Sequence, residues 1–349
     1  MKIACLYTGA LRTIRDTLPH FQKNVLQAAT AAGHTIDVFA VLQSNDPAHY
    51  REPNWSDTQF PPTIPNHPMQ NVQTVEIWLT EQLSSHLQSL TWFRPNNPLW
   101  VRLREYLLNN MCLVPEVTEY LRTSGSMIEY YQMQMAYMDM LKHERHHNIT
   151  YDYVIRLRPD VVIAQPLSFD WLQWSVEDIE KRFLEIQKVT QSSGVYCENN
   201  FVRFMNTVYR STVDCLLDTE MEADPPHNIF KPADDNTAAQ IQTYLRHGPY
   251  ILTLRKNVVY MLPRKCMALI ACLGSTFGMY HNPNHSEWWW NAESQLRFVC
   301  LDHGIQTFDS GTALEVESLY NYDANNYYNP VLHTLCEDNP RVFFFIKRL

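Results

Sequence analysis

The sequence lacks several features that would place it in a common functional class. None of its eight cysteines forms a C-x-x-C pair, which argues against a structural zinc site and against a compact disulfide framework. No apolar run approaches the roughly 20 residues of a membrane-spanning helix. The P-loop, H-E-x-x-H and G-x-S-x-G motifs are also missing, so P-loop, zincin and α/β-hydrolase chemistry is excluded.

The chain has no excess of basic charge either. Its formal net charge is −9, so a nucleic-acid-binding surface is not expected. An acidic chain can still hold a basic pocket for a phosphorylated small molecule. Most of the scattered cysteines lie in apolar contexts, and the N-terminus MKIACLYTG predicts a first strand rather than a signal peptide. Both features predict a reducing, cytoplasmic setting.

The N-terminal pattern predicts an α/β fold. An apolar run, Ile3–Tyr7, stops at Thr8-Gly9-Ala10, and apolar residues then recur at helical spacing up to Gly33. A second apolar strand follows at residues 36–42. A strand, a glycine turn, a helix and a second strand begin an α/β sheet, in which ligands commonly bind after the first strand. Six prolines in residues 43–70 predict a long irregular insertion.

The rest of the chain continues this alternation without a clear linker, which predicts one domain, 1–349, with a nucleotide-binding half (1–165) and an acceptor-side half (166–349). Ser126 and Glu129 form a possible capping box that opens a long, buried helix. That helix spans residues 126–147. Further expected elements include helices at 75–90 and 99–111 and strands at 251–254 and 258–262.

The segment YDYVIRLRPDVVI, residues 151–163, places three charges in one apolar strand. Arg156, Arg158 and Asp160 occupy alternate positions, so a strand would direct all three to one face. Burying an ion costs several kcal/mol unless it is paired or bound. Two interpretations remain open. The charges bind a ligand at the carboxyl edge of the sheet, or they form internal ion pairs that fix the strand.

Three motifs lie at the beginning, centre and end of the chain. They are a strand ending in G-x-x-R (Gly9 to Arg12) before IDVFAVL, the central Y-D-x-V-I-R-x-R-x-D, and the late E-x-x-L helix in AESQLRFVCLDHG. This combination resembles GT-A-type glycosyltransferase-like proteins of bacteria and large DNA viruses. The resemblance implies a GT-A-like fold, with a Rossmann-type mixed central sheet flanked by helices.

The resemblance also implies a nucleotide-sugar site. Thr8, Gly9 and Arg12 would contact the base, ribose or phosphates of the donor. Asp160 would correspond to the second acid of a D-x-D motif and bind Mn²⁺ or Mg²⁺ beside the diphosphate. The first acid of that motif is replaced by Arg158, which could supply part of the metal's charge. The nucleotide-sugar-binding set is therefore Thr8, Gly9, Arg12, Arg156, Arg158 and Asp160.

Inverting transfer also needs a carboxylate that deprotonates the acceptor hydroxyl. Asp234 and Asp235 open a predicted helix and are the first candidates, although helix capping explains such residues equally simply. Glu293 is a rival. The neighbouring Trp288 and Trp289 have faces that suit sugar rings, and core packing is the alternative.

A late histidine, His281, is a candidate second metal ligand. With these residues, the sequence predicts a glycosyltransferase that moves a sugar from a nucleoside-diphosphate sugar to a glycan or another hydroxyl acceptor. The alternatives are a catalytically inactive nucleotide-sugar- or glycan-binding protein and a nucleotidyltransferase. The expected location is the cytoplasm, or the host cytoplasm for a viral protein, with no membrane span and no nucleic-acid partner.

Overall fold

The computed structural model describes residues 1–43, 71–110, 115–123, 125–164, 166–167, 169–175, 177–178, 181, 209–211, 248–254, 259–277, 292, 295–296, 299–300, 303, 305–310 and 344–346. The strands are β1 (Lys2–Ala10), β2 (Thr35–Gln43), β3 (Leu87–Phe93), β4 (Tyr153–Leu157), β5 (Val161–Ile163), β6 (Tyr209–Ser211), β7 (Tyr250–Leu254), β8 (Val259–Pro263), β9 (Gln306–Ser310) and β10 (Phe344–Ile346). The α-helices are α1 (Ile14–Phe21), α2 (Ala28–Ala31), α4 (Val72–Leu83), α5 (Pro98–Asn110), α6 (Pro115–Thr123), α7 (Ser126–His147) and α12 (Arg264–Thr276). Shorter turns are the π-helix η1 (Gln22–Gln27) and the 3₁₀ helices η3 (Ser84–His86) and η4 (Asp170–Gln173).

The predicted mixed central sheet is confirmed. Eight strands lie in the order β3-β2-β1-β4-β8-β7-β9-β6, and a separate pair joins β10 to β5. Strands β3, β2, β1 and β4 are mutually parallel, whereas β8 runs antiparallel to β4 and β7 antiparallel to β8. The parallel half has the strand order of a Rossmann-like sheet.

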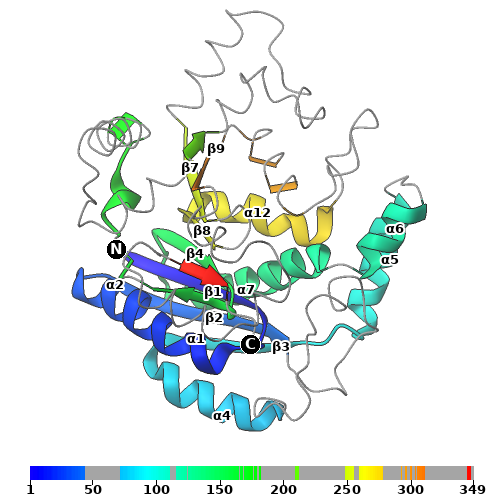
Figure 1. Ribbon diagram of the computed structural model, residues 1–349, viewed down its shortest axis with the longest axis horizontal. Helices are drawn as coiled ribbons and strands as arrows, with labels where there is room; N and C mark the ends of the chain where they lie inside the picture. Colours follow the sequence, from blue (N-terminus) through cyan, green and yellow to red (C-terminus); the bar gives the residue numbers. More distant parts are fainter. Residues whose placement is uncertain are drawn as a thin grey trace, which may run out of the picture.

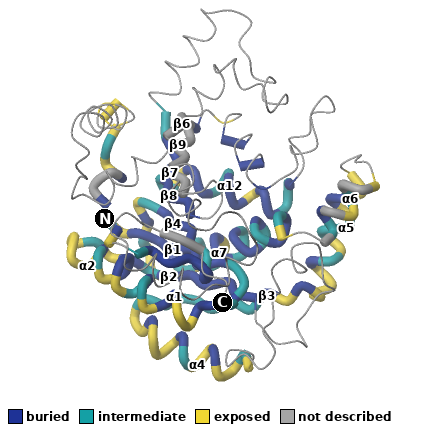
Figure 2. The backbone as a smooth tube through the Cα atoms, in the orientation of Figure 1, coloured by how far each residue is buried: buried dark blue, intermediate teal, exposed yellow. Residues whose placement is uncertain are grey.

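Helices cover both faces of the sheet (Figure 1). Alternate residues of β1 separate into two cores, because successive side chains of a strand point to opposite faces. Cys5 and Tyr7 pack with α1 and α4, while Ala4 and Leu6 pack with α7 and α12. Figure 2 accordingly shows β1 buried along most of its length, as expected for a central parallel strand.

Two predictions about helices need correction. Residues 75–90 do not form one helix: α4 ends at Leu83, and 87–93 form the edge strand β3, because pairing with β2 overrides a helix-like spacing of leucines. The predicted capping box is absent, because α7 is preceded by Gly125 and no side chain caps it. The helix at 126–147 itself is confirmed, as are the helix at 99–111 and the strands at 251–254 and 258–262, each with ends shifted by one residue or less.

The charged segment 151–163 is not one continuous strand. Strand β4 ends at Leu157, and Arg158 to Asp160 form a turn before β5 begins at Val161. Pro159 has no N–H to donate to a sheet ladder, which explains the break. Arg156 alone of the three charges therefore lies within β4, and the other two lie just past its carboxyl end.

The Pro-rich insertion falls outside the described residues, apart from Gln43 at the end of β2. Among the helices that the structure describes, none is both long and apolar enough to cross a membrane.

Candidate functional site

The candidate site lies where the order of the sheet reverses. The chain builds β2 and β3 on one side of β1 and then returns on the other side as β4. Ligands of open α/β sheets bind at such a reversal, outside the carboxyl ends of the strands. The parallel register pairs Tyr7 with Leu157, so the segments 8–12 and 158–160 that follow these residues meet at one edge.

Asp160 is held at this edge by two arginines. Nε of Arg158 donates to Oδ1 at 2.9 Å and Nη2 to Oδ2 at 2.7 Å, while Nη1 of Arg12 donates to Oδ2 at 2.9 Å. The Asp160 side chain is only 3% exposed, against 17% for Arg12 and 16% for Arg158. The carboxylate is therefore more deeply buried than either arginine side chain.

The backbone beside this cluster is constrained on the β1 side. Gly9 has φ +145°, and a Cβ there would lie 3.0 Å from Cδ of Pro159. Glycine thus permits the close approach of the two segments. Arg12 has φ 37°, which is unusual for a residue with a side chain and costs about 1–3 kcal/mol. Such strain persists where the surrounding structure holds the residue, as the ion pair to Asp160 does here.

Arg156 forms an inner layer of the site, more deeply buried than Arg12 and Arg158. It is 1% exposed; its Nε donates to Oγ1 of Thr8 at 3.1 Å, and its Nη1 lies 3.1 Å from Oε1 of Glu129 in α7. Its guanidinium carbon also lies 5.4 Å from the centre of the Tyr260 ring in β8. Thr8 is fully buried as well, so neither Thr8 nor Arg156 faces solvent.

The turn that carries Asp160 is tied to the first helical segment. Oγ1 of Thr17 donates to the carbonyl of Pro159, and Nδ2 of the buried Asn24 donates to the carbonyl of Ile163 at 2.6 Å. The N–H of Leu167 returns a hydrogen bond to the carbonyl of Asn24 at 2.7 Å. These contacts to α1 and η1 fix the turn on both sides of Asp160.

The electrostatics of the edge favour an anion. Burial lowers the pKa of Arg158, but the charge and hydrogen bonds of Asp160 outweigh it, so the pKa rises above its ordinary value. Arg12, Arg158 and Asp160 together leave one net positive charge. Arg156 and Glu129 behind them cancel.

The described residues do not fit the divalent metal that the family resemblance implies. Both oxygens of Asp160 accept guanidinium N–H groups, and a cation on this carboxylate would approach two positive charges. Within the described ranges, no three His, Cys, Asp or Glu side chains gather closely enough to hold a metal ion. His281, the second predicted ligand, lies outside those ranges.

The predicted nucleotide-sugar-binding residues do come together. Thr8 and Gly9 lie near the carboxyl end of β1 and Arg12 follows it, and the three residues contact Arg156 in β4, Pro159 and Asp160 in the turn after it. Arg156 does not pair with Asp152 of the same segment. The structure instead gives it Glu129 from a helix, while Asp152 accepts the backbone N–H of Lys2 at the opposite end of β4.

Other predicted residues fall in parts of the chain that the structure does not describe: Asp234, Asp235, Glu293, Trp288 and Trp289. Two residues of the site were missed, Glu129 and Tyr260. Glu129 was interpreted as a helix-capping residue, so its ion pair with Arg156 was not predicted. Tyr260 carried no signal beyond a place in an apolar strand.

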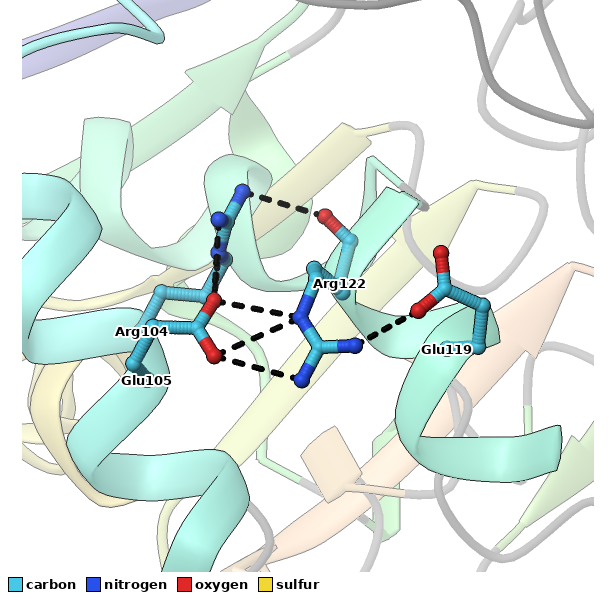
Figure 3. A network of polar contacts seen from close by, with 4 residues as sticks. All are labelled: Arg104, Glu105, Glu119 and Arg122. Carbon is cyan, nitrogen blue, oxygen red and sulfur yellow. Dashed lines mark hydrogen bonds and ion pairs between the residues drawn. The ribbon is translucent and has the colours of Figure 1, made fainter. Parts of the chain in front are cut away.

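A second arginine–carboxylate cluster lies between α5 and α6 (Figure 3). Glu105 accepts hydrogen bonds from both Arg104 and Arg122, and Arg122 also pairs with Glu119. Glu105 is 34% exposed and Arg122 is 35% exposed. The four charges cancel. This surface cluster, Arg104, Glu105, Glu119 and Arg122, provides an internal reference for the edge cluster, Arg12, Arg158 and Asp160.

Comparison with known proteins adds no family assignment. No family model matches the chain, and no curated protein sequence matches it significantly.

Proposed function

We propose that the chain is a GT-A-type glycosyltransferase that moves a sugar from a nucleoside-diphosphate sugar to a glycan or another hydroxyl acceptor. The observation that carries the proposal is the edge cluster, in which two arginines and one carboxylate leave a net positive charge at the reversal of the sheet. Guanidinium groups bind phosphate oxygens in bidentate fashion, and this position is where α/β sheets bind nucleotides. The motif resemblance points to the same donor class.

The described residues would act on the leaving group. When the sugar departs, negative charge develops on the diphosphate, and N–H donors already fixed in place stabilise that charge without reorganising. Arg12 and Arg158 are the donors at the solvent side of the cluster. Asp160 orients them, and Arg156 with Thr8 supports the turn from behind. The base that deprotonates the acceptor remains a prediction at Asp234, Asp235 or Glu293.

A ligand panel tests this proposal. The protein is melted with uridine, guanosine, adenosine, cytidine and thymidine diphosphate sugars, and any stabilising donor is then incubated alone and with hydroxyl acceptors. A donor at about 100 times its Kd adds about 2.7 kcal/mol to folding stability by mass action. We expect one donor to raise Tm and to release free sugar and nucleoside diphosphate. If no nucleotide sugar shifts Tm, the proposal is wrong.

A binding protein without catalysis is the second candidate. It is favoured by the pairing of both carboxylates described at the edge, Asp160 and Glu129, with arginines, which occupies them in ion pairs. Slow donor hydrolysis separates the two candidates, because a transferase leaks sugar to water and a binding module leaves the donor intact. A nucleotidyltransferase would instead release pyrophosphate from a nucleoside triphosphate.

A further inference from the structure

We infer that the edge cluster binds the diphosphate of its ligand without a divalent metal, with Arg12 and Arg158 supplying the positive charge. The inference rests on the proposed function, since it concerns how the same site holds its donor. Asp160 is then a positioning residue that aims two guanidiniums, not a metal ligand.

The first argument concerns the N–H donors of Arg12 and Arg158 that Asp160 does not use. Each arginine has five N–H donors. Among the described contacts, Asp160 takes two from Arg158 and one from Arg12, and Nε of Arg12 is buried without a partner. Among the described contacts, Asp160 therefore engages only three of the N–H groups of the two arginines. Their parent side chains are fixed in direction by the carboxylate, so little rotamer freedom is lost when a ligand binds.

The arrangement of exposure carries the second step. Asp160 is almost completely buried, whereas both arginines are partly exposed. An arginine side chain is therefore more accessible to an incoming ion than the carboxylate is. That order attracts a diphosphate and repels Mn²⁺ or Mg²⁺. A metal site would require the reverse, with carboxylate oxygens facing the ligand.

Calorimetric titration tests the inference. The probes are inorganic pyrophosphate and the uridine, guanosine, adenosine, cytidine and thymidine diphosphates, each titrated in excess EDTA and again in Mn²⁺. Mn²⁺ is also titrated alone. We expect at least one diphosphate to bind with a Kd that agrees within about twofold between the two conditions, and no Mn²⁺ binding to the free protein. Arg158→Lys and Arg12→Lys each lose the planar fork and should weaken binding in EDTA about tenfold or more.

Matched controls distinguish the outcomes. Arg122→Lys makes the same exchange in the surface cluster and should leave the Kd unchanged, and circular dichroism melts show whether each variant is folded. Binding that requires Mn²⁺ overturns the inference while leaving the proposed function intact. Metal-free binding that survives Arg158→Lys and Arg12→Lys in folded protein also overturns it. Failure of every diphosphate in both conditions rejects the proposed function as well.

Discussion

The edge cluster and the surface cluster contain the same types of residue but differ in burial and in net charge. In each, one carboxylate accepts hydrogen bonds from two arginines: Asp160 from Arg12 and Arg158, and Glu105 from Arg104 and Arg122. The carboxylate is 3% exposed at the edge and 34% exposed at the surface. At the surface, Glu119 neutralises the remaining charge, while the edge cluster keeps a net positive charge.

This difference shows how to separate structural ion pairs from a binding site. A neutral, partly exposed network joins two helices and contributes little to stability, because water screens it. A buried carboxylate that leaves two arginines partly exposed has no such simple structural explanation, since an apolar pair would serve packing as well. The surplus charge at the reversal of the sheet is the observation on which the proposed donor site rests.

Removing the central carboxylate should give the largest contrast. Asp160→Asn leaves two guanidiniums facing each other around a neutral amide, and we expect it to lower the free energy of unfolding by about 3 kcal/mol. Glu105→Gln, the matched change at the surface, should cost about 1 kcal/mol or less. Urea denaturation of both variants measures these values. Equal losses would show that the two clusters do not differ in burial as described.

Replacing the arginine of the inner layer comes second. Lysine at position 156 cannot keep both the bond to Thr8 and the pair with Glu129, so Arg156→Lys should destabilise the fold by about 2 kcal/mol. Arg104→Lys at the surface should change stability by about 0.5 kcal/mol at most. Thermal and urea melts compare the two. A neutral Arg156→Lys would mean that the inner layer does not support the edge.

The smallest effect is a pH dependence at the surface cluster. Burial acts to raise the pKa of Glu105, but Arg122 and Arg104 outweigh it and lower the pKa below its ordinary value of 4.5. The stability contributed by a carboxylate with a lowered pKa is present above that value and is lost as pH falls through the folded-state pKa. The difference between wild type and Glu105→Gln, about 0.5 kcal/mol at pH 6, should be smaller at a pH well below 4.5. Urea melts at both pH values measure it, and a difference that grows on acidification would contradict the assignment.

Local patterns predicted most of what lies near the reversal of the sheet. The first strand with its glycine turn and the helix at 126–147 follow from apolar spacing and from glycine's tolerance of unusual φ, both of which are local. The family resemblance, not a local pattern, assigned Arg12 and Asp160 to one site, and the structure brings the two side chains together.

Features that depend on distant parts of the chain could not be predicted in this way. Strand β3 was missed because Leu83, Leu87 and Leu90 fit a helix as well as a strand, and only pairing with β2 decides between them. Glu129 was missed as the partner of Arg156 because the packing of α7 on the sheet brings the two together. No spacing within either segment carries that information.

Amide hydrogen exchange with and without a bound donor tests the central claim most directly. The protein is compared alone and with the nucleoside-diphosphate sugar that gives the largest rise in Tm. The account predicts slower exchange in peptides covering residues 8–12 and 157–161, and unchanged exchange in peptides covering the surface cluster at residues 104–122. Protection confined to other parts of the chain, with residues 8–12 and 157–161 unchanged, would contradict the assignment of the edge cluster as the donor site.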